Sequence, residues 1–218
     1  RAARLILENK GRVLIGTGFP VVGSFETDGP IGAIALYRVL ERLGHEPIFG
    51  CAPPISHVLA GDFRTLEVPI LSWEDTRPIV ESALADIRPS VIVSIERPGV
   101  AKDGRYYNMH GKDISDFLAK FDLFFELCDC PTIAVGDGGN EMGMGNIITQ
   151  LAQLPIVPSV TRCDELVIAT VSNWGVYGII AAMSRELHQD LFSLFDPAEI
   201  VRHLVDWGAV DGKTGAAE

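Results

Sequence analysis

The stretch TIAVGDGGNEMGMGNIITQL, residues 132–151, places a strand, a glycine-rich loop and a helix in direct succession. TIAV is a continuous apolar run of the kind found in strands that are buried on both faces of a parallel sheet. Five glycines between positions 136 and 145 mark a loop in which backbone geometry matters more than side-chain packing. Met144, Ile147 and Leu151 then recur at helical spacing. We therefore predict one strand–loop–helix unit of an α/β fold here.

The same unit recurs along the chain. Apolar runs predict strands at 12–19, 46–50, 66–71, 90–96 and 165–172. Helical periodicity, with Pro, Asp and Gly as end signals, predicts helices at 30–43, 76–88, 114–125, 173–187 and 197–208. The alternation favours an α/β fold with an open, mostly parallel, doubly wound sheet and helices on both faces. Because no repeat or linker divides the chain, we expect residues 1–218 to form a single α/β domain.

Composition narrows the class of protein. Hydrophobic residues make up 47% of the chain and charged residues 22%, as expected for a folded protein. The net charge of −11, without a basic stripe, argues against nucleic acid and anionic membranes as partners. Apolar runs end well before the roughly 20 residues that a membrane helix needs. We expect a small-molecule substrate; assembly into a homo-oligomer stays open.

The four cysteines are scattered and show neither a disulfide framework nor zinc-site spacing. Cys128 and Cys130 form a C-x-C pair, which we interpret as packing at a helix end. Few cysteines without a pairing pattern favour a reducing compartment. We therefore expect a cytoplasmic protein, or one of the mitochondrial matrix if the source is a eukaryote.

Acidic residues follow several of the predicted strands. In open α/β sheets, ligands bind beyond the carboxyl ends of the strands. The carboxylates expected at this edge are Glu26, Asp28, Glu96, Asp137 and Glu141. Like charges held close together raise one another's pKa or require a cation, and an oxygen-rich site suits Mn²⁺ or Mg²⁺. The sequence thus predicts a divalent-metal site.

Each of these acids also has a simpler interpretation. Asp28 is well placed to cap the helix that begins at Pro30. Glu96 ends a strand, where solvated carboxylates are common, and Asp137 suits an Asx-turn. The polar segment 97–113 is predicted to be a functional loop or lid.

Nucleotide-binding motifs do not fit. The loop 136–145 lacks the Gly-Lys-Ser/Thr of a Walker A motif, although its glycines can still expose N–H groups to an anion. Gly16 and Gly18 follow a strand, but the next glycine, Gly23, falls outside the G-x-G-x-x-G spacing. We therefore do not predict NAD as a cofactor.

Four blocks together resemble a known family. They are GFP…ETDGP (18–30), ERPG…DGRYYNMHGKDIS (96–115), VGDGGNEMGMG (135–145) and VSNWGVYG (171–178). In this order they are similar to the D-glutamate cyclase C-terminal-like family. The resemblance implies a lyase of the dehydratase type, which converts D-glutamate to 5-oxo-D-proline and water.

That reaction implies roles for residues in these blocks. Its amine needs a general base, and its γ-carboxyl group needs protonation or a metal. We assign Asp137 or Glu141 as the base and Glu96 as acid or metal ligand. The expected substrate-binding residues are Arg97 or Arg105 for the α-carboxylate, with Asn108, Asn140 and Asn173 orienting the substrate.

Two other functions stay open at this point. The same carboxylates, holding Mn²⁺ or Mg²⁺, would suit a phosphohydrolase acting on a phosphorylated metabolite. A non-catalytic module that binds a metal or an amino acid is the third hypothesis.

Overall fold

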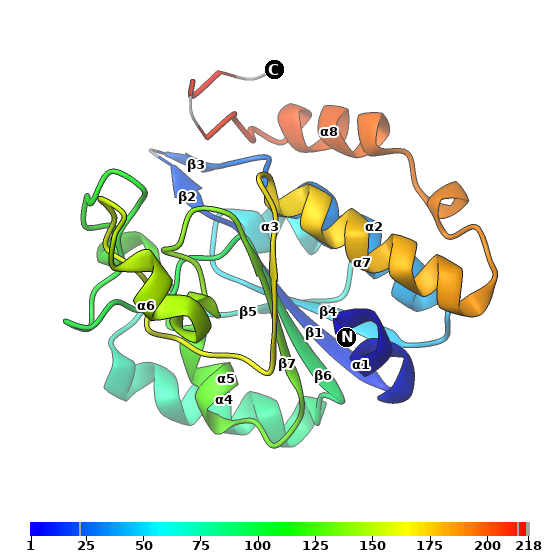
Figure 1. Cartoon of the computed structure of the whole chain (residues 1–218), viewed down its shortest axis with the longest axis horizontal. Helices are drawn as coiled ribbons and strands as arrows, with labels where there is room; N and C mark the ends of the chain where they lie inside the picture. The colour runs from blue at the N-terminus through cyan, green and yellow to red at the C-terminus, as the bar shows by residue number, and fades with distance from the viewer. Residues whose placement is uncertain (22, 213, 217–218) are drawn as a thin grey trace.

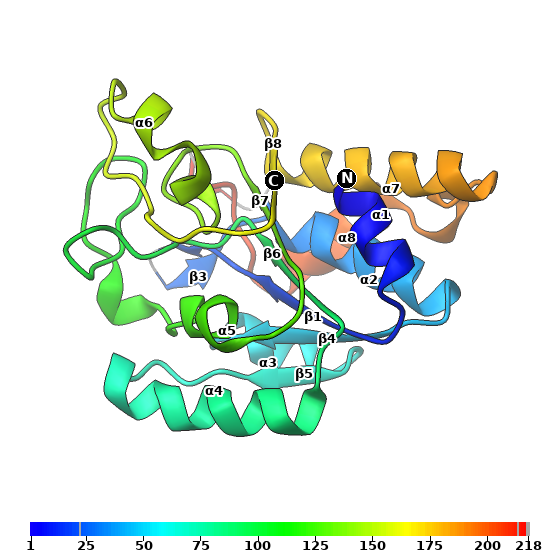
Figure 2. The ribbon, with the colours of Figure 1, turned by 60° about the horizontal axis from the view of Figure 1, so that its bottom comes forward.

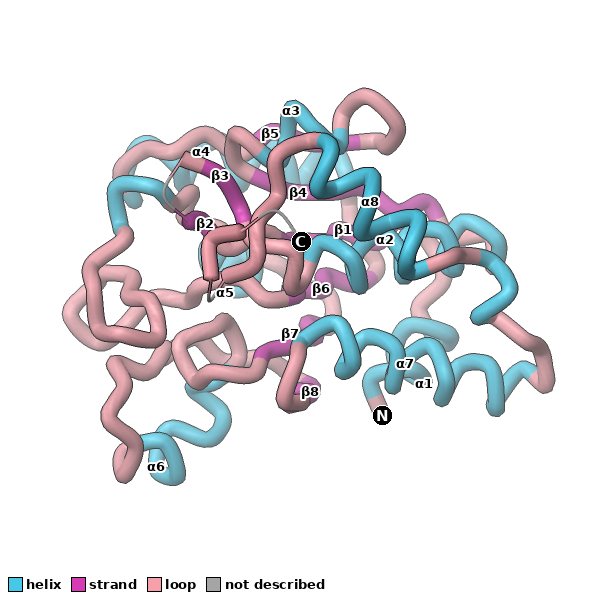
Figure 3. Tube along the Cα trace, turned by 90° about the horizontal axis from the view of Figure 1, so that it is seen from above, coloured by secondary structure: helices cyan, strands magenta, loops and turns pink. Residues whose placement is uncertain are grey.

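The computed structural model describes residues 1–21, 23–212 and 214–216. Within these residues, six strands form one parallel sheet in the order β5-β4-β1-β6-β7-β8, which Figure 3 shows from above. The strands are β1 (Arg12–Thr17), β4 (Glu46–Cys51), β5 (Thr65–Glu67), β6 (Val91–Ile95), β7 (Thr132–Gly136) and β8 (Glu165–Ile168). A small antiparallel pair, β2 (Pro20–Val21) and β3 (Ser24–Phe25), follows β1.

The strand order confirms the predicted doubly wound fold. Taken in chain order among themselves, the strands of the parallel sheet run 3-2-1-4-5-6, which is the Rossmann arrangement. The order reverses between β1 and β6, which pair directly from Val13 with Val91 to Thr17 with Ile95. Ligands of such sheets bind outside the carboxyl ends of the strands at this reversal, so the topology points to the exits of β1 and β6.

Helices cover both faces of the sheet (Figures 1 and 2). On one face lie α1 (Ala2–Glu8), α2 (Pro30–Arg42), α7 (Ser172–Leu187) and α8 (Pro197–Asp206); on the other lie α4 (Trp73–Ile87) and α5 (Asp122–Leu127). Successive side chains of β1 point to opposite faces of the sheet. Val13 and Ile15 pack against the first group of helices, and Leu14 packs against the second. None of the helices in the described part of the chain is long and apolar enough to cross a membrane.

The remaining helical segments are short. They are α3 (Ile55–Leu59), α6 (Ile148–Leu151) and the 3₁₀ turns η1 (Ser115–Phe117), η2 (Met144–Ile147) and η3 (Phe192–Leu194). The helix predicted over 144–151 is therefore split into η2 and α6.

The continuous helix predicted over 114–125 is wrong. The chain forms η1, becomes extended at Leu118, and enters α5 only at Asp122. Leu118 and Phe121 are both buried but belong to separate apolar clusters. In a continuous helix these two residues would lie on the same face and could not pack into both clusters. The Lys120 ammonium group fixes the break by donating to the carbonyl of Leu118 at 2.9 Å. Tertiary packing has overridden the helical periodicity here.

Other boundaries differ by smaller amounts. α4 begins at Trp73 rather than at residue 76, because the Ser72 side chain caps it by accepting from Asp75 N at 3.1 Å. The strand predicted at 66–71 is limited to Thr65–Glu67, and α1 was not predicted at all.

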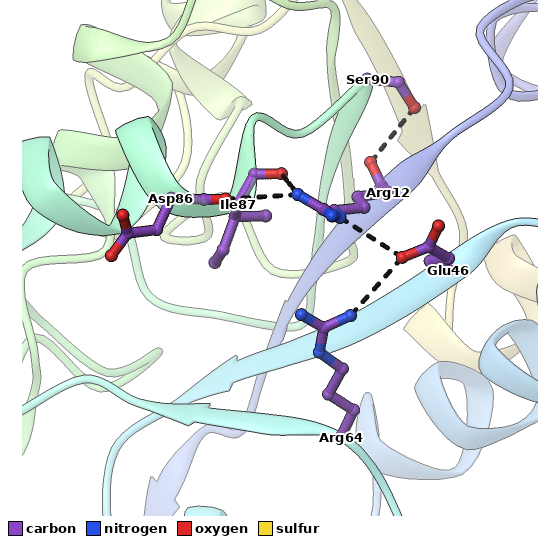
Figure 4. Close-up of polar contacts among 6 residues, drawn as sticks. All are labelled: Arg12, Glu46, Arg64, Asp86, Ile87 and Ser90. Carbon is purple, nitrogen blue, oxygen red and sulfur yellow. Dashed lines mark hydrogen bonds and ion pairs between the residues drawn. The ribbon is translucent and has the colours of Figure 1, made fainter.

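A polar network ties β1, β4 and α4 together at the amino end of the sheet (Figure 4). The Arg12 guanidinium donates to the Ile87 carbonyl at 2.9 Å, which lies at the end of α4, and reaches the Glu46 carboxylate at 3.3 Å. Arg64 pairs with the same carboxylate at 3.6 Å. The network therefore stabilises the amino-terminal edge of the sheet, which lies opposite the carboxyl ends of the strands.

Candidate functional site

Three carboxylates converge beside the reversal of strand order. Asp28, Glu96 and Asp137 each offer one oxygen atom, and these atoms lie within 4.8 Å of one another. Glu96 and Asp137 directly follow β6 and β7, while Asp28 follows the β2–β3 pair that extends from β1. Residues far apart in sequence thus meet at the predicted edge, and we call these three the carboxylate cluster.

Asp28 is a helix cap, but not of the helix that sequence suggested. Its carboxylate accepts from the backbone N–H groups of Ser172 at 2.9 Å and Asn173 at 2.8 Å, at the start of α7. It also accepts from its neighbour Gly29 at 2.9 Å. The interpretation that Asp28 serves only its own helix, α2, is therefore wrong: it binds the positive end of a helix distant in sequence.

Asn173 caps α2 in return. Its side-chain carbonyl accepts from the N–H groups of Gly29 at 3.0 Å and Gly32 at 2.7 Å. The two loops that carry Asp28 and Asn173 therefore cap each other's helices, and α2 and α7 pack side by side in Figure 1. This exchange holds the Asp28 carboxylate in one orientation at the cluster.

The capping exchange predicts an unequal loss of stability in two alanine variants. Asn173→Ala removes the acceptor for two buried N–H groups, so we expect the free energy of unfolding to fall by about 2 kcal/mol. Asp196→Ala, the matched control, removes the exposed cap that serves Ala198 N in α8 and should cost about 1 kcal/mol. Urea denaturation measures both. Equal losses in the two variants would mean that the exchange contributes nothing beyond an ordinary cap.

Glu96 is the strained member of the cluster. The residue is 4% exposed, and its backbone has φ of +44°, which a non-glycine residue rarely adopts. The Ser172 hydroxyl donates to its carboxylate, and a Cβ at Gly29 would lie 2.6 Å from the Glu96 Cβ. Burial raises the pKa of Glu96 well above its ordinary value, and the nearby Glu141 and Asp137 raise it further.

Glu141 fills the glycine loop from within. Its carboxylate accepts from the N–H groups of Gly138 at 2.9 Å and Gly139 at 2.7 Å, and the side chain is buried. Burial raises the pKa of Glu141, while these two hydrogen bonds oppose the shift. Because the loop's own carboxylate occupies these donors, they are not available to hold a phosphate.

Glu26 lies beside the cluster and contacts the segment that follows α8, for which the sequence predicted no structure. Its backbone forms a bridge with Val210, and a Cβ at Gly212 would lie 2.0 Å from its carboxylate oxygen. Burial, followed by the charges of Asp28 and Asp137, raises the pKa of Glu26 from 4.5 to about 8. Nothing in the sequence after position 208 signals this pairing, since the bridge is not part of a regular strand.

The predicted asparagines have other partners in the described structure. Asn140 is buried and its side-chain amide donates to the carbonyl of Tyr107 at 2.9 Å. The Asn108 side chain accepts from the N–H groups of His110 and Lys112, both at 3.0 Å, and so closes its own turn. Asn173 caps α2 in a similar way. The side chains of all three asparagines therefore hydrogen-bond to backbone groups of the loops around the cluster and hold these loops in place.

Arg97 and Arg105 are the alternatives predicted for holding a substrate carboxylate, and the structure places them in different surroundings. Arg97 is 1% exposed, lies 4.8 Å over the Phe121 ring and donates to the carbonyl of Thr17 at 3.2 Å. Arg105 is exposed and pairs with Asp113 at 3.6 Å. These contacts give Arg97 a structural role in the core beneath the sheet and place Arg105 on the surface of the loop.

The segment 97–113 is tied to the body of the protein. The buried Asp122 carboxylate accepts from Val100 N at 3.0 Å and from the Tyr106 hydroxyl at 2.7 Å. Trp73 stacks on the Tyr106 ring at a centroid distance of 6.1 Å. Of the two predicted roles, loop or lid, these anchors favour a fixed loop.

Two hydroxyl residues at the site were not predicted as site residues. Ser172 orients Glu96, as described above. Thr17 ends β1, and in the described structure its buried hydroxyl has no hydrogen-bond partner; a Cβ at Gly29 would lie 3.1 Å from it. The sequence signals that could have identified them are the position of Ser172 at the start of a helix and that of Thr17 at the end of a strand.

Comparisons with known proteins agree with the resemblance. A family model described as D-glutamate cyclase-like, C-terminal, matches residues 1–218. The chain belongs to this D-glutamate cyclase-like family. It is 35% identical over 216 residues to the human protein named D-glutamate cyclase, mitochondrial. The match covers 83% of this chain and 34% of the human protein, so the chain spans about a third of that relative's length.

Solved structures are similar only at a distance. MurG from Acinetobacter baumannii has a TM-score of 0.42 at 10% identity, covering 75% of this chain and 46% of MurG. The C-terminal domain of the coenzyme A biosynthesis protein CoaBC has a TM-score of 0.40 at 14% identity, covering 82% and 96% of the two chains. Likeness at this level carries no information about the function of a D-glutamate cyclase-like protein.

Proposed function

We propose that the protein is a lyase that converts D-glutamate to 5-oxo-D-proline and water at the carboxylate cluster. The observation that carries this proposal is the meeting of Asp28, Glu96 and Asp137 within 4.8 Å at the carboxyl edge of a D-glutamate cyclase-like chain. Cyclisation moves protons from an amine to a departing oxygen, and carboxylates with displaced pKa values are suited to that task.

The cluster also fits a divalent cation. Its donors are carboxylate oxygens, the type that Mn²⁺ and Mg²⁺ prefer. Oxygens on opposite sides of such an ion are about 4 Å apart, which the 4.8 Å limit of the cluster accommodates. Asp28, Glu96 and Asp137 would hold the ion, with Glu26 and Glu141 close to it. A bound ion would polarise the γ-carboxyl group of the substrate.

The chain's own residues can supply the proton transfers. Glu141 is a better candidate for the base than Asp137, because Glu141 is not one of the three residues of the carboxylate cluster. Its pKa is also raised toward neutral pH, where a general base works best. As the substrate nitrogen bonds to the γ-carbon, its ammonium group gives up two of its three protons and keeps the third as the lactam N–H, while one carboxyl oxygen takes up two protons and leaves as water. Glu26, whose pKa is raised to about 8, holds a proton at neutral pH that can be passed to that oxygen.

A cyclisation assay tests the proposal. We expect purified protein to form 5-oxo-D-proline from D-glutamate in the presence of Mn²⁺ or Mg²⁺, detected by chiral chromatography, and EDTA to suppress it. L-glutamate serves as the matched control substrate. Absence of 5-oxoproline with folded protein and either ion would contradict the proposal.

The phosphohydrolase hypothesis has no comparable support. The N–H groups of Gly138 and Gly139, which a phosphate would use, are bonded to Glu141. A phosphomonoester added to the same assay separates the two functions. Release of phosphate without cyclisation would favour the hydrolase.

A further inference from the structure

A pair of thiols lies at the edge of the sheet opposite the carboxylate cluster. Cys128 and Cys130 are in the turn between α5 and β7, so they precede the amino end of the strand whose carboxyl end leads to Asp137. Both are free and partly buried. In Figure 2 this turn follows α5, which packs beside α4. Chemistry at this pair would therefore be separate from the proposed cyclisation.

The two thiols differ in their surroundings. The Cys128 thiol lies 3.4 Å from the carbonyl of Cys130 and 3.7 Å from that of Phe125. A hydrogen bond from the Cys130 thiol lowers the pKa of Cys128, and the same contact raises the pKa of Cys130. The Cys128 thiol is therefore the more readily ionised of the two.

A small cavity opens onto this pair. Its volume is about 360 Å³, and Leu84, Arg88 and Leu127 line it together with Cys128 and Cys130. The side chains of α4 thus form one wall and the C-x-C turn the other. Cavities of this size admit small molecules, so a reagent can approach the sulfur atoms without unfolding the core.

We propose that Cys128 and Cys130 form a redox-active dithiol that exchanges with low-molecular-weight disulfides. The Cys128 thiolate attacks one sulfur of the disulfide, forms a mixed disulfide and releases one thiolate. Cys130 then loses its proton and attacks the Cys128 sulfur, which releases the second thiolate. The protein loses two electrons and two protons in forming its disulfide, and the reagent is reduced to two thiols.

The other two cysteines provide internal controls. Cys51 is fully buried, and burial raises its pKa to about 11. Burial likewise raises the pKa of Cys163 to about 12. Neither thiol lines the cavity beside Cys128. Exchange should therefore be confined to the C-x-C pair.

Oxidised glutathione is the probe for a direct test. The folded protein is incubated with it near neutral pH, and peptides are then analysed by mass spectrometry. We expect a disulfide between Cys128 and Cys130 that dithiothreitol reverses. In Cys130→Ser, the mixed disulfide should accumulate on Cys128. In Cys128→Ser, the adduct should form on the order of 10-fold more slowly.

The outcomes decide the proposal. Both cysteines staying reduced in the wild-type protein, or Cys130→Ser collecting no adduct, would overturn it. Equal modification of Cys51 or Cys163 would overturn the assignment to this turn. Thermal melting of each variant shows that it is folded, and a second reagent, iodoacetamide, checks the order of reactivity. It should alkylate Cys128 before the other thiols.

Discussion

Glu96→Gln should lower the rate of cyclisation by roughly 10³-fold while making the folded protein more stable. The glutamine keeps the shape of Glu96 and can still accept from the Ser172 hydroxyl, but it neither carries charge nor transfers a proton. Since burial and Glu141 oppose ionisation at this position, replacing the ionisable group by a neutral one should raise the free energy of unfolding at neutral pH. Turnover of D-glutamate and urea denaturation measure the two effects.

Glu67→Gln is the matched control for this variant. Glu67 also ends a strand of the sheet, and it also accepts from a serine, Ser56, at 3.0 Å. Its side chain, however, is 50% exposed and lies outside the cluster. We expect Glu67→Gln to change neither turnover nor stability appreciably. Full activity in Glu96→Gln would remove Glu96 from the proposed mechanism.

Sequence was sufficient for the parts of the fold that repeat a local pattern. The exits of β6 and β7 follow continuous apolar runs, so Glu96 and Asp137 could be placed at the same edge of the sheet. The carboxyl-edge rule then predicted a meeting of five carboxylates, and in the structure three of them, Asp28, Glu96 and Asp137, have oxygen atoms within 4.8 Å of one another.

Sequence was not sufficient where distant contacts decide local structure. Asp28 precedes a helix and therefore suggested a local cap, yet its donors are Ser172 and Asn173. Arg97 follows Glu96 directly, but its side chain enters the core beneath the sheet, where the guanidinium lies over the Phe121 ring. Neither outcome is encoded in a motif; both depend on which segment packs opposite the residue.

The metal-free protein should lose stability as pH rises from about 6 to about 8, and Glu26 contributes to this dependence. The pKa of Glu26 is 4.5 when unperturbed and about 8 in the folded protein. Between these values the unfolded chain has released the proton while the folded protein retains it, so raising the pH favours unfolding. Above about 8 both states are ionised and the loss levels off. The contribution of Glu26 alone is on the order of 2 kcal/mol between about pH 6 and about pH 8.

Glu26→Gln separates this cause from general effects of pH. Position 26 then has no proton to lose, so the free energy of unfolding of the variant in urea, with EDTA present, should change with pH by a smaller amount than that of the wild type. Mn²⁺ should reverse the loss in the wild-type protein at pH about 8, because a cation that binds only the folded state stabilises it and offsets the clustered negative charge. An identical pH profile in Glu26→Gln would show that Glu26 does not hold the proton. A profile that Mn²⁺ leaves unchanged would count against a cation at Asp28, Glu96 and Asp137, since these carboxylates surround the group whose charge the ion would neutralise.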